Sequence, residues 1–272
     1  MHQLGKIIGG IPSSDLRNRI VRFLYKRKGM RLESIEKTED DTFWIHKVNG
    51  IYFATEVLNW YRNYESFEND CRQISLAYFK PVAGNIIIDL GAGLGEEAIV
   101  YSKLVGSGGK VYAVEANPRI CKVLKNVIDL NNFSNTTVLN LAISDQSGTI
   151  EIEDAEDSYI SSSVNTNKST KTFTVQAMGM DDFIEKNNIT RIDLLKVNIE
   201  GAEKFVMQTL VKHFGRVKHF AISCHDFRYK RGESEFYKTK ELVISYFNSK
   251  GMTVHQQNSG IDHIDDWIYV KA

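Results

Sequence analysis

Two hydrophobic periods alternate along residues 81–272. Short apolar runs rich in β-branched residues predict buried strands near 85–90, 110–115, 137–142, 192–198 and 217–224. Helical spacing of apolar residues predicts helices near 95–105, 118–131, 203–214 and 234–249. This alternation is typical of an α/β fold with a doubly wound, mainly parallel sheet. The end of the chain, 251–257 and 266–270, predicts two more strands that form an antiparallel edge.

Residues 1–80 have a different pattern, which predicts an N-terminal extension before a domain at 81–272. A helix is expected over 13–28 and another over 66–80, which ends at Pro81. Between them, 42–53 predicts a β-hairpin around Asn49-Gly50. The first helix carries an apolar stripe made of Leu16, Ile20, Phe23 and Leu24.

An inserted hairpin is predicted from 148–153 and 171–176. The polar stretch 154–170 between its strands has no periodicity and is long for a connection. Two interpretations stay open: a segment that covers the substrate side, or simple surface disorder.

The strand near 85–90 ends at Asp89, and Gly91, Gly93 and Gly95 follow at every second position. Glycines let the backbone turn tightly and approach a ligand, and the helix that begins there offers free N–H groups. This predicts a nucleotide-type cofactor site at the carboxyl end of a parallel strand. The dinucleotide fingerprint would need a small residue at Glu96, so a redox dinucleotide is disfavoured.

The next strand ends in Glu115, twenty positions beyond Gly95. A carboxylate at that register can accept hydrogen bonds from both ribose hydroxyls. Adenine-ribose binding is therefore expected, and both types of cofactor remain open at this point.

The fourth strand decides between them. It runs into Lys196-Val197-Asn198-Ile199-Glu200-Gly201-Ala202-Glu203, which closely resembles the K-[IV]-D-[IV]-E-G-A-E signature of the FkbM family of methyltransferases. Order and spacing agree over about residues 84–212, with matching blocks at 89–95, 115–118, 126, 130–131, 141–144, 148 and 180–183. One position departs from the pattern, because the family's usual aspartate is Asn198 here.

The resemblance implies a Rossmann-like class I methyltransferase fold with S-adenosylmethionine as cofactor. It also implies an oxygen acceptor: a hydroxyl on a sugar, glycan, lipid-linked or secondary-metabolite molecule. The cofactor-binding residues expected from the motifs and the resemblance are Asp89, Gly91, Ala92, Gly93, Gly95, Glu115, Ala116, Asn140, Ala142 and Ile143.

If the acceptor is a hydroxyl, a base must remove its proton. Glu200 in the motif and His225 after the fifth strand are the leading candidates, and Asn198 lies where a carboxylate would stand beside the methyl donor. Glu203 also follows the fourth strand, but it is better explained as a favourable acid in a first helical turn. Glu200, His225 and Asp226 could also hold a divalent metal, but no short spacing motif supports this and a metal is not favoured.

Charge and cysteine content restrict the partners. Lys plus Arg equals Asp plus Glu at 34 each, so nothing draws the whole chain to nucleic acid. Three scattered cysteines favour a reducing compartment. No apolar run approaches the roughly 20 residues of a membrane span, and we expect the protein in the cytoplasm. Residues 1–31 carry eight basic residues and one acidic residue, which suits a membrane surface or a solvated face. Packing of the apolar stripe on the core or in a homodimer is the favoured explanation.

Two other functions are kept as alternatives. The first is a nicotinamide-dependent oxidoreductase, which Glu96 and the fourth-strand motif disfavour. The second is a non-catalytic cofactor-binding module, to which Asn198 gives some weight.

Overall fold

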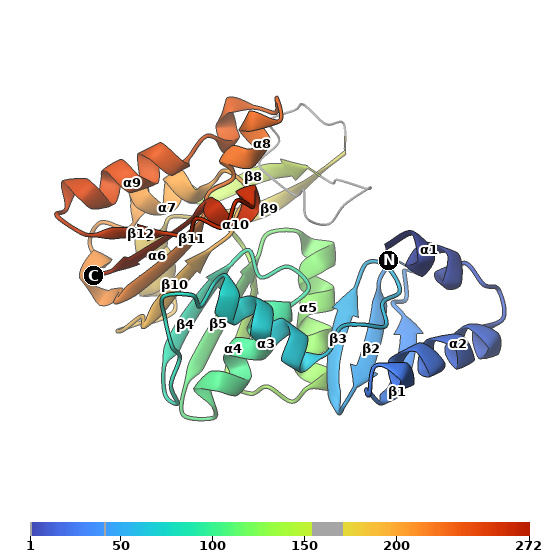
Figure 1. Ribbon diagram of the computed structural model, residues 1–272. Coiled ribbons are helices and arrows are strands. Elements are labelled where there is room, and N and C mark those ends of the chain that lie inside the picture. The colour runs from blue at the N-terminus through green and yellow to red at the C-terminus, as the bar shows by residue number, and fades with distance from the viewer. Residues whose placement is uncertain (1, 41, 154–170) are drawn as a thin grey trace.

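A seven-stranded sheet forms the centre of the computed structural model, which describes residues 2–40, 42–153 and 171–272 (Figure 1). The strand order is β12-β13-β11-β10-β4-β5-β6, and β13 runs in the direction opposite to the other six strands. This confirms the doubly wound, mainly parallel sheet with an antiparallel C-terminal edge. The strands are β4 (Ile86–Leu90), β5 (Lys110–Glu115), β6 (Thr136–Asn140), β10 (Leu194–Val197), β11 (His219–Ser223), β12 (Val254–Gln256) and β13 (Trp267–Lys271).

Helices cover both faces of this sheet because successive side chains of each strand point to opposite sides. Ile87 and Leu194 pack with α3 (Tyr64–Gln73), α4 (Glu96–Val105) and α5 (Pro118–Leu130). Ile88 and Leu195 pack on the other face with α6 (Met180–Lys186), α7 (Glu203–Thr209) and α9 (Lys240–Ser249). The fully apolar strands are therefore explained by burial on two sides.

A second, three-stranded sheet lies beside the main one, with the order β7-β9-β8. The third predicted strand is divided: β6 ends at Asn140, and β7 (Ala142–Ile143) pairs with β9 (Thr172–Met178). The predicted hairpin is confirmed, since β8 (Gly148–Glu153) runs antiparallel to β9. The hypothesis of a substrate cover at 154–170 concerns a segment that lies outside the described residues.

The N-terminal extension consists of α1 (His2–Gly9), α2 (Ser14–Arg27) and a sheet of β1 (Leu32–Lys37), β2 (Trp44–Val48) and β3 (Ile51–Thr55). The hairpin prediction is confirmed, because Asn49 and Gly50 both have positive φ, as a type I′ turn requires. Strand β1 was not expected from the sequence. Its register shifts between Leu32 and Ser34, so the buried Leu32 and Ile35 are three positions apart and the alternation of period two is lost.

The extension is packed against the domain that follows it. The side-chain amide of Asn131, the residue after α5, accepts from the N–H of Tyr52 and donates to its carbonyl, at 2.9 and 2.7 Å. One hydrophobic cluster also runs from Val21 and Phe53 to Ile99 on α4. The division of the chain at residue 80 stays a prediction.

Short helical turns complete the chain, and one of them divides a predicted helix. The expected helix at 234–249 begins with a 3₁₀ turn (Glu235–Tyr237), and α9 starts only at Lys240. Asp226 accounts for this start, because its carboxylate accepts from the backbone N–H groups of Thr239 and Lys240, both at 2.8 Å. The remaining turns are α8 (Asp226–Lys230), α10 (Asp262–Asp265) and a second 3₁₀ turn (Phe214–Arg216).

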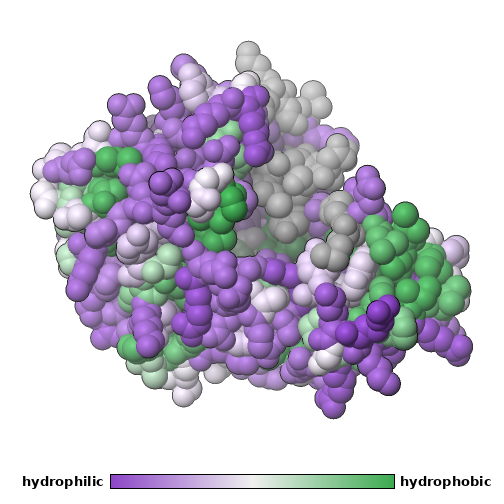
Figure 2. All heavy atoms as spheres, in the orientation of Figure 1, coloured by the Kyte–Doolittle hydropathy of each residue, from purple (hydrophilic) through white to green (hydrophobic). Residues whose placement is uncertain are grey.

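Helix α2 packs on the sheet of the extension through Val21 and Tyr25, which are fully buried. Two members of the predicted apolar stripe, Leu16 and Phe23, are exposed instead. Packing on the core is therefore wrong for this part of the stripe, and packing in a homodimer stays a prediction. Figure 2 shows hydrophobic side chains gathered on the surface over α1, with hydrophilic ones beside them. Among the helices of the described residues, none has the length and apolar character needed to span a membrane.

Candidate active site

The loop between β4 and α4 is pressed against the end of β10. Gly91 has a φ of +75°, and a Cβ there would lie 1.8 Å from the carbonyl oxygen of Asn198. Only glycine fits this position, since any side chain would collide with backbone. The Nζ of Lys196 on β10 also donates to the Gly91 carbonyl at 2.9 Å. The glycine loop and the fourth-strand motif are thus parts of one structure.

A cavity of about 300 Å³ opens above this loop, and we call it the glycine-loop cavity. This volume is at the lower end of the range for small-molecule sites. Its lining combines the loop, the ends of β5 and β10, and the apolar surface of the small sheet. Seven of the predicted cofactor residues line it: Gly91, Ala92, Gly93, Glu115, Ala116, Ala142 and Ile143.

Glu115 holds the side of the cavity next to β5. One carboxylate oxygen accepts from the N–H of Gly93 at 3.0 Å, and the other accepts from Asn117 at 2.8 Å. Burial raises the pKa of Glu115, and these two N–H groups act in the opposite direction. Each oxygen has a second lone pair. The carboxylate is therefore oriented by backbone while it can still accept hydrogen bonds from hydroxyls in the cavity.

Three predicted cofactor residues lie behind the lining instead of in it. Asp89 is fully buried below the loop. Gly95 begins α4 with a φ of +96°, and a Cβ there would lie 2.7 Å from a leucine of α5. The Asn140 amide donates to the carbonyls of Glu115 and Ala116 at 2.9 and 2.8 Å. In this structure the three residues position the lining, and direct contact of any of them with a cofactor stays a prediction.

Beneath the loop, Lys196 forms a buried ionic cluster. Its Nζ lies 2.8 Å from Asp89 and 2.7 Å from Glu97, and Lys196 and Asp89 are both fully buried. Burial raises the pKa of Asp89 to about 6, and the charge of Lys196 limits the rise. Burial would raise the pKa of Glu97, but Lys196 together with the hydroxyls of Ser75 and Tyr101 more than offsets it, so the pKa is lowered. The charge of Lys196 thus keeps the two acids together under the loop.

A second cavity of about 510 Å³ adjoins the first past the ends of β10 and β11, and we call it the strand-end cavity. Four residues line both cavities: Glu96, Glu97, Asn198 and Glu200. One wall of this cavity is formed by α3 and the segment before it, and another wall by the chain after β11. The other lining residues are Arg62, Phe67, Asp70, Cys71, Ile74, Ser223, His225, Phe227, Arg231, His263 and Trp267.

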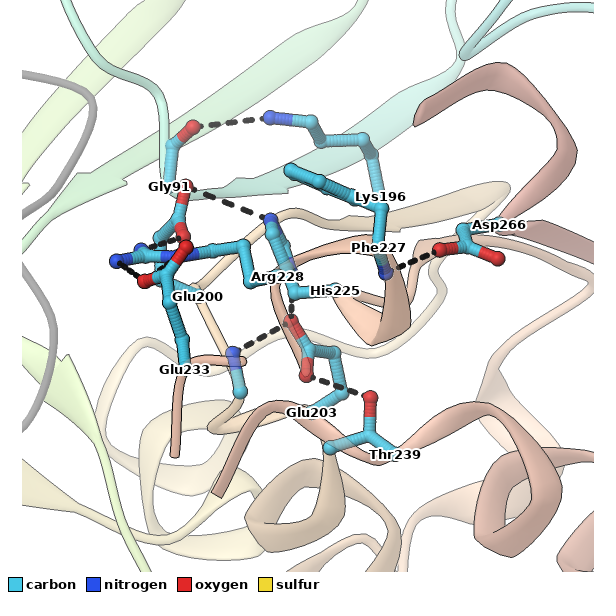
Figure 3. Close-up of polar contacts among 11 residues, drawn as sticks. Gly91, Lys196, Glu200, Glu203, His225, Phe227, Arg228, Glu233, Thr239 and Asp266 are labelled. Carbon is cyan, nitrogen blue, oxygen red and sulfur yellow. Dashed lines mark hydrogen bonds and ion pairs between the residues drawn. The ribbon is translucent and has the colours of Figure 1, made fainter. Parts of the chain in front are cut away.

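Two carboxylates flank His225 at the boundary between the cavities (Figure 3). Its Nδ1 lies 2.7 Å from Glu203, and its Nε2 lies 3.5 Å from Glu200. Glu203 is fully buried and also accepts from the hydroxyl of Thr239 at 3.1 Å. Glu200 accepts from Arg228 at 2.5 Å. The structure thus brings the two predicted catalytic residues together and adds Glu203 and Arg228 behind them.

The charges in this group follow from its geometry. Burial alone would lower the pKa of His225, but Glu203 and Glu200 more than offset it and raise the pKa to about 10. His225 is therefore an imidazolium at neutral pH, which makes it unsuitable as a free base. Burial would raise the pKa of Glu200, but His225 and Arg228 more than offset this effect. The pKa of Glu200 is therefore lowered, and the carboxylate is ionised.

Glu200 is placed by an unusual backbone. It has a φ of +54° although it is not glycine, and Gly201 follows at +91°. Such a conformation costs of order 1–3 kcal/mol and is concentrated at functional sites. The turn aims Glu200 at the boundary of the cavities, next to Asn198. Within the described part of the chain, the side-chain amide of Asn198 makes no hydrogen bond, although it lines both cavities.

The structure does not support the metal set suggested by Glu200, His225 and Asp226. The Asp226 carboxylate is turned away from the other two, because it accepts hydrogen bonds from the backbone N–H groups at the start of α9. Over residues 2–40, 42–153 and 171–272, no group of three or more His, Cys, Asp or Glu side chains is arranged to hold a metal ion.

Residues 89–268, more than half of the chain, match the family model described as Methyltransferase FkbM domain. The chain belongs to the FkbM methyltransferase family. Membership of this methyltransferase family disfavours the nicotinamide alternative.

Relatives of this FkbM methyltransferase match over shorter stretches. A protein-L-isoaspartate O-methyltransferase of Methanococcoides burtonii is 36% identical over 61 residues, which are 22% of this chain and 30% of the relative. Another, of Methanocella arvoryzae, is 36% identical over 55 residues, 20% of this chain and 29% of the relative. The chain thus spans less than a third of the length of these curated relatives.

Solved structures of methyltransferases are also similar at low identity. Methyltransferase FkbM from Methylobacillus flagellatus is 16% identical, with 71% of this chain and 45% of the other covered and a TM-score of 0.46. A SAM-dependent methyltransferase from Aquifex aeolicus is 14% identical, with 77% and 97% covered and a TM-score of 0.43. Both scores are below 0.5, so membership of the family depends on the family model.

The residues of the glycine-loop cavity fit S-adenosylmethionine. A Cβ at Gly93 would meet no atom within 4 Å, so the loop presents open space to a ligand. The Glu115 carboxylate suits ribose hydroxyls, and Ala142 and Ile143 offer an apolar wall to adenine. The residues missed from the sequence are those of α3 and Arg228, because no local signal places them at the end of a distant sheet.

Proposed function

We propose that the protein is an O-methyltransferase, which methylates a hydroxyl group of an acceptor bound in the strand-end cavity. One observation carries the proposal: the two cavities meet at Asn198 and Glu200. A donor in one cavity and an acceptor in the other would face each other there. An oxygen acceptor is favoured by the resemblance of the fourth-strand motif to its family, and the two curated relatives are named O-methyltransferases.

S-adenosylmethionine supplies an activated methyl group on its sulfonium. The protein must hold the acceptor in line with it, and positioning of this kind contributes about 7–11 kcal/mol in favourable systems. The free amide of Asn198 can hydrogen-bond an acceptor hydroxyl at the boundary. Compared with the usual aspartate, it does so without adding a negative charge.

Glu200 is proposed as the group that accepts the hydroxyl proton. It is ionised, and its side chain is 13% exposed toward the cavities. His225 and Arg228 fix its orientation. His225 stays protonated because Glu203 lies at 2.7 Å, so its role is to hold Glu200 in place and balance its charge.

The strand-end cavity favours an acceptor with several hydroxyls. The rings of Phe67, Phe227 and Trp267 provide apolar surface, and Arg62 and Asp70 provide charged hydrogen-bonding groups beside them. A sugar, free or within a glycan or a lipid-linked molecule, has both an apolar ring face and hydroxyls. A secondary metabolite with the same features is a further member of this class.

The test measures release of S-adenosylhomocysteine across hydroxylated sugars, lipids and natural products, with and without a chelator. We expect turnover with at least one polyhydroxylated acceptor. Glu200→Gln should lose turnover by about 10²–10⁴-fold, the usual contribution of a positioned base, and still bind S-adenosylmethionine in calorimetry. Glu241→Gln changes an exposed glutamate on α9 and is the matched control.

Two outcomes would contradict the proposal. The first is full turnover of Glu200→Gln, which would remove the base assignment. The second is retention of S-adenosylmethionine without transfer to any acceptor, which would favour the non-catalytic module.

A further inference from the structure

Large apolar side chains are exposed on the first two helices. Leu4 and Ile7 on α1 are 48% and 68% exposed, and Leu16 and Phe23 on α2 are 52% and 60% exposed. We call these four residues the α1–α2 face. Figure 2 shows the hydrophobic surface over α1 beside a hydrophilic one. Clustered apolar exposure of this kind marks an interaction site more often than scattered single residues do.

The two members on α2 lie on one stripe. Leu16 and Phe23 are seven residues apart, which places them within about 20° around the helix axis. The opposite side of α2 is occupied, because Val21 and Tyr25 are fully buried against the extension. On α1, the buried Ile8 lies about 100° around the axis from Ile7 and about 40° from Leu4, so Leu4 borders the packing side of this helix. The exposed stripe of α2 and the exposed Ile7 of α1 are thus away from the packing sides of their helices.

Positive charge surrounds the stripe. Residues 1–31 hold eight of the 34 Lys and Arg and one of the 34 Asp and Glu. Arg19 and Lys26 lie about 60–80° to one side of Leu16 on the helical wheel. In the described part of the chain, neither they nor Lys6 and Lys28 have a carboxylate partner. The guanidinium of Arg27 lies 5.9 Å from the centre of the Phe23 ring, so it belongs to the stripe itself.

We propose that the α1–α2 face binds an anionic lipid surface. An apolar stripe flanked by Lys and Arg on an amphipathic helix is suited to lie in the headgroup region. A second copy of the chain fits less well, because a symmetric dimer through this face would bring the basic residues of both copies together. The lipid surface satisfies both features at once, since acyl chains cover Ile7 and Phe23 while phosphates neutralise Arg19 and Lys26.

Flotation of the whole protein with vesicles tests the proposal. Vesicles of phosphatidylcholine and phosphatidylglycerol should carry the protein, and vesicles of phosphatidylcholine alone should not. Ile7→Ser and Phe23→Ser should each weaken partition about tenfold. Arg19→Gln with Lys26→Gln should weaken it roughly 30-fold, at about a factor of five per charge.

Matched variants separate this surface from general effects. Val211→Ser and Leu242→Ser change exposed apolar residues elsewhere, and Lys80→Gln with Lys186→Gln removes two other exposed charges. These controls should float like the wild type. Circular dichroism of every variant should be unchanged, since none of the replaced side chains is buried.

Three results would overturn the proposal. One is a wild type that stays unbound with anionic vesicles, and another is equal loss of binding in the control variants. The third is a dimer in light scattering that Ile7→Ser and Phe23→Ser dissociate, which would make the face an interface between copies. Methyl transfer is not the readout, so the failure of this proposal and that of the proposed function are distinguishable.

Discussion

Lys196→Met removes the only cation that contacts both acids beneath the glycine loop in the described structure. Lys196 lies 2.8 Å from Asp89 and 2.7 Å from Glu97, and its side chain has no exposed surface. Methionine has a similar length and no charge, so the substitution leaves two carboxylates close together with no cation beside them, although Tyr101 still donates to Glu97. It also removes the hydrogen bond to the Gly91 carbonyl.

The expected cost is about 3–5 kcal/mol in the free energy of unfolding, the value for breaking a buried ion pair by removal of one partner. Because total stability is about 5–15 kcal/mol, this is a large fraction of the whole. The cost should depend on pH. Burial already holds the pKa of Asp89 at about 6, and without Lys196 it rises further. A carboxyl with a raised folded-state pKa favours folding at low pH, and wild type already shows this effect up to about pH 6. The deficit of the variant relative to wild type should therefore grow as the pH rises above about 6.

Urea unfolding of wild type and variant at several pH values measures this cost. The control is Lys125→Met, which removes an exposed lysine 2.8 Å from Asp129 on α5 and should cost about 0–1 kcal/mol. Adding Glu97→Gln to Lys196→Met should restore part of the stability, because one of the two unpaired charges is removed. A loss below about 1 kcal/mol for Lys196→Met, independent of pH, would refute the reasoning.

Three further predictions concern the two cavities. Gly91→Ala should destabilise the fold by about 2–5 kcal/mol in urea unfolding, because strain at positive φ costs about 1–2 and the contact with the Asn198 carbonyl adds about 1–3. Glu115→Ala should strongly weaken S-adenosylmethionine binding in calorimetry, because no other carboxylate takes its place at the end of β5. The ring resonances of His225 should titrate in NMR near pH 10 instead of 6.5. The stability from its protonated form is then complete below pH 6.5 and is lost as the pH rises through about 10.

Each of these has a control and a contradicting result. Gly251→Ala has a similar φ of +71° with no atom within 4 Å of the added Cβ, so it should cost only about 1–2 kcal/mol. Equal costs for the two glycine variants would contradict the close approach at Gly91. Unchanged affinity of Glu115→Ala would defeat the ribose assignment. Titration of the His225 ring near neutral pH would make it a candidate base again. It would also contradict its role as the charged partner that holds Glu200.

Local patterns were sufficient for the central sheet. Short apolar runs rich in β-branched residues predicted its strands, and the Asn49-Gly50 turn predicted a hairpin. Both signals come from residues that are neighbours in the sequence. The same holds for the glycine loop: Gly91 and Gly93 were found from spacing, and both line the cavity. Strand β1 was missed because a register shift removed its alternation.

What the amino-acid order determined by itself is the fold class, the family and the cofactor loop, since each depends on contiguous residues. Tertiary structure decided the charges and the acceptor cavity. His225 was a natural base in the sequence, and only the approach of Glu203 and Glu200 from another segment makes it a cation. The walls of the strand-end cavity come from α3 and the end of the chain, far apart in sequence. Electrostatic interaction depends on distance and burial in space, and neither can be read from spacing along the chain.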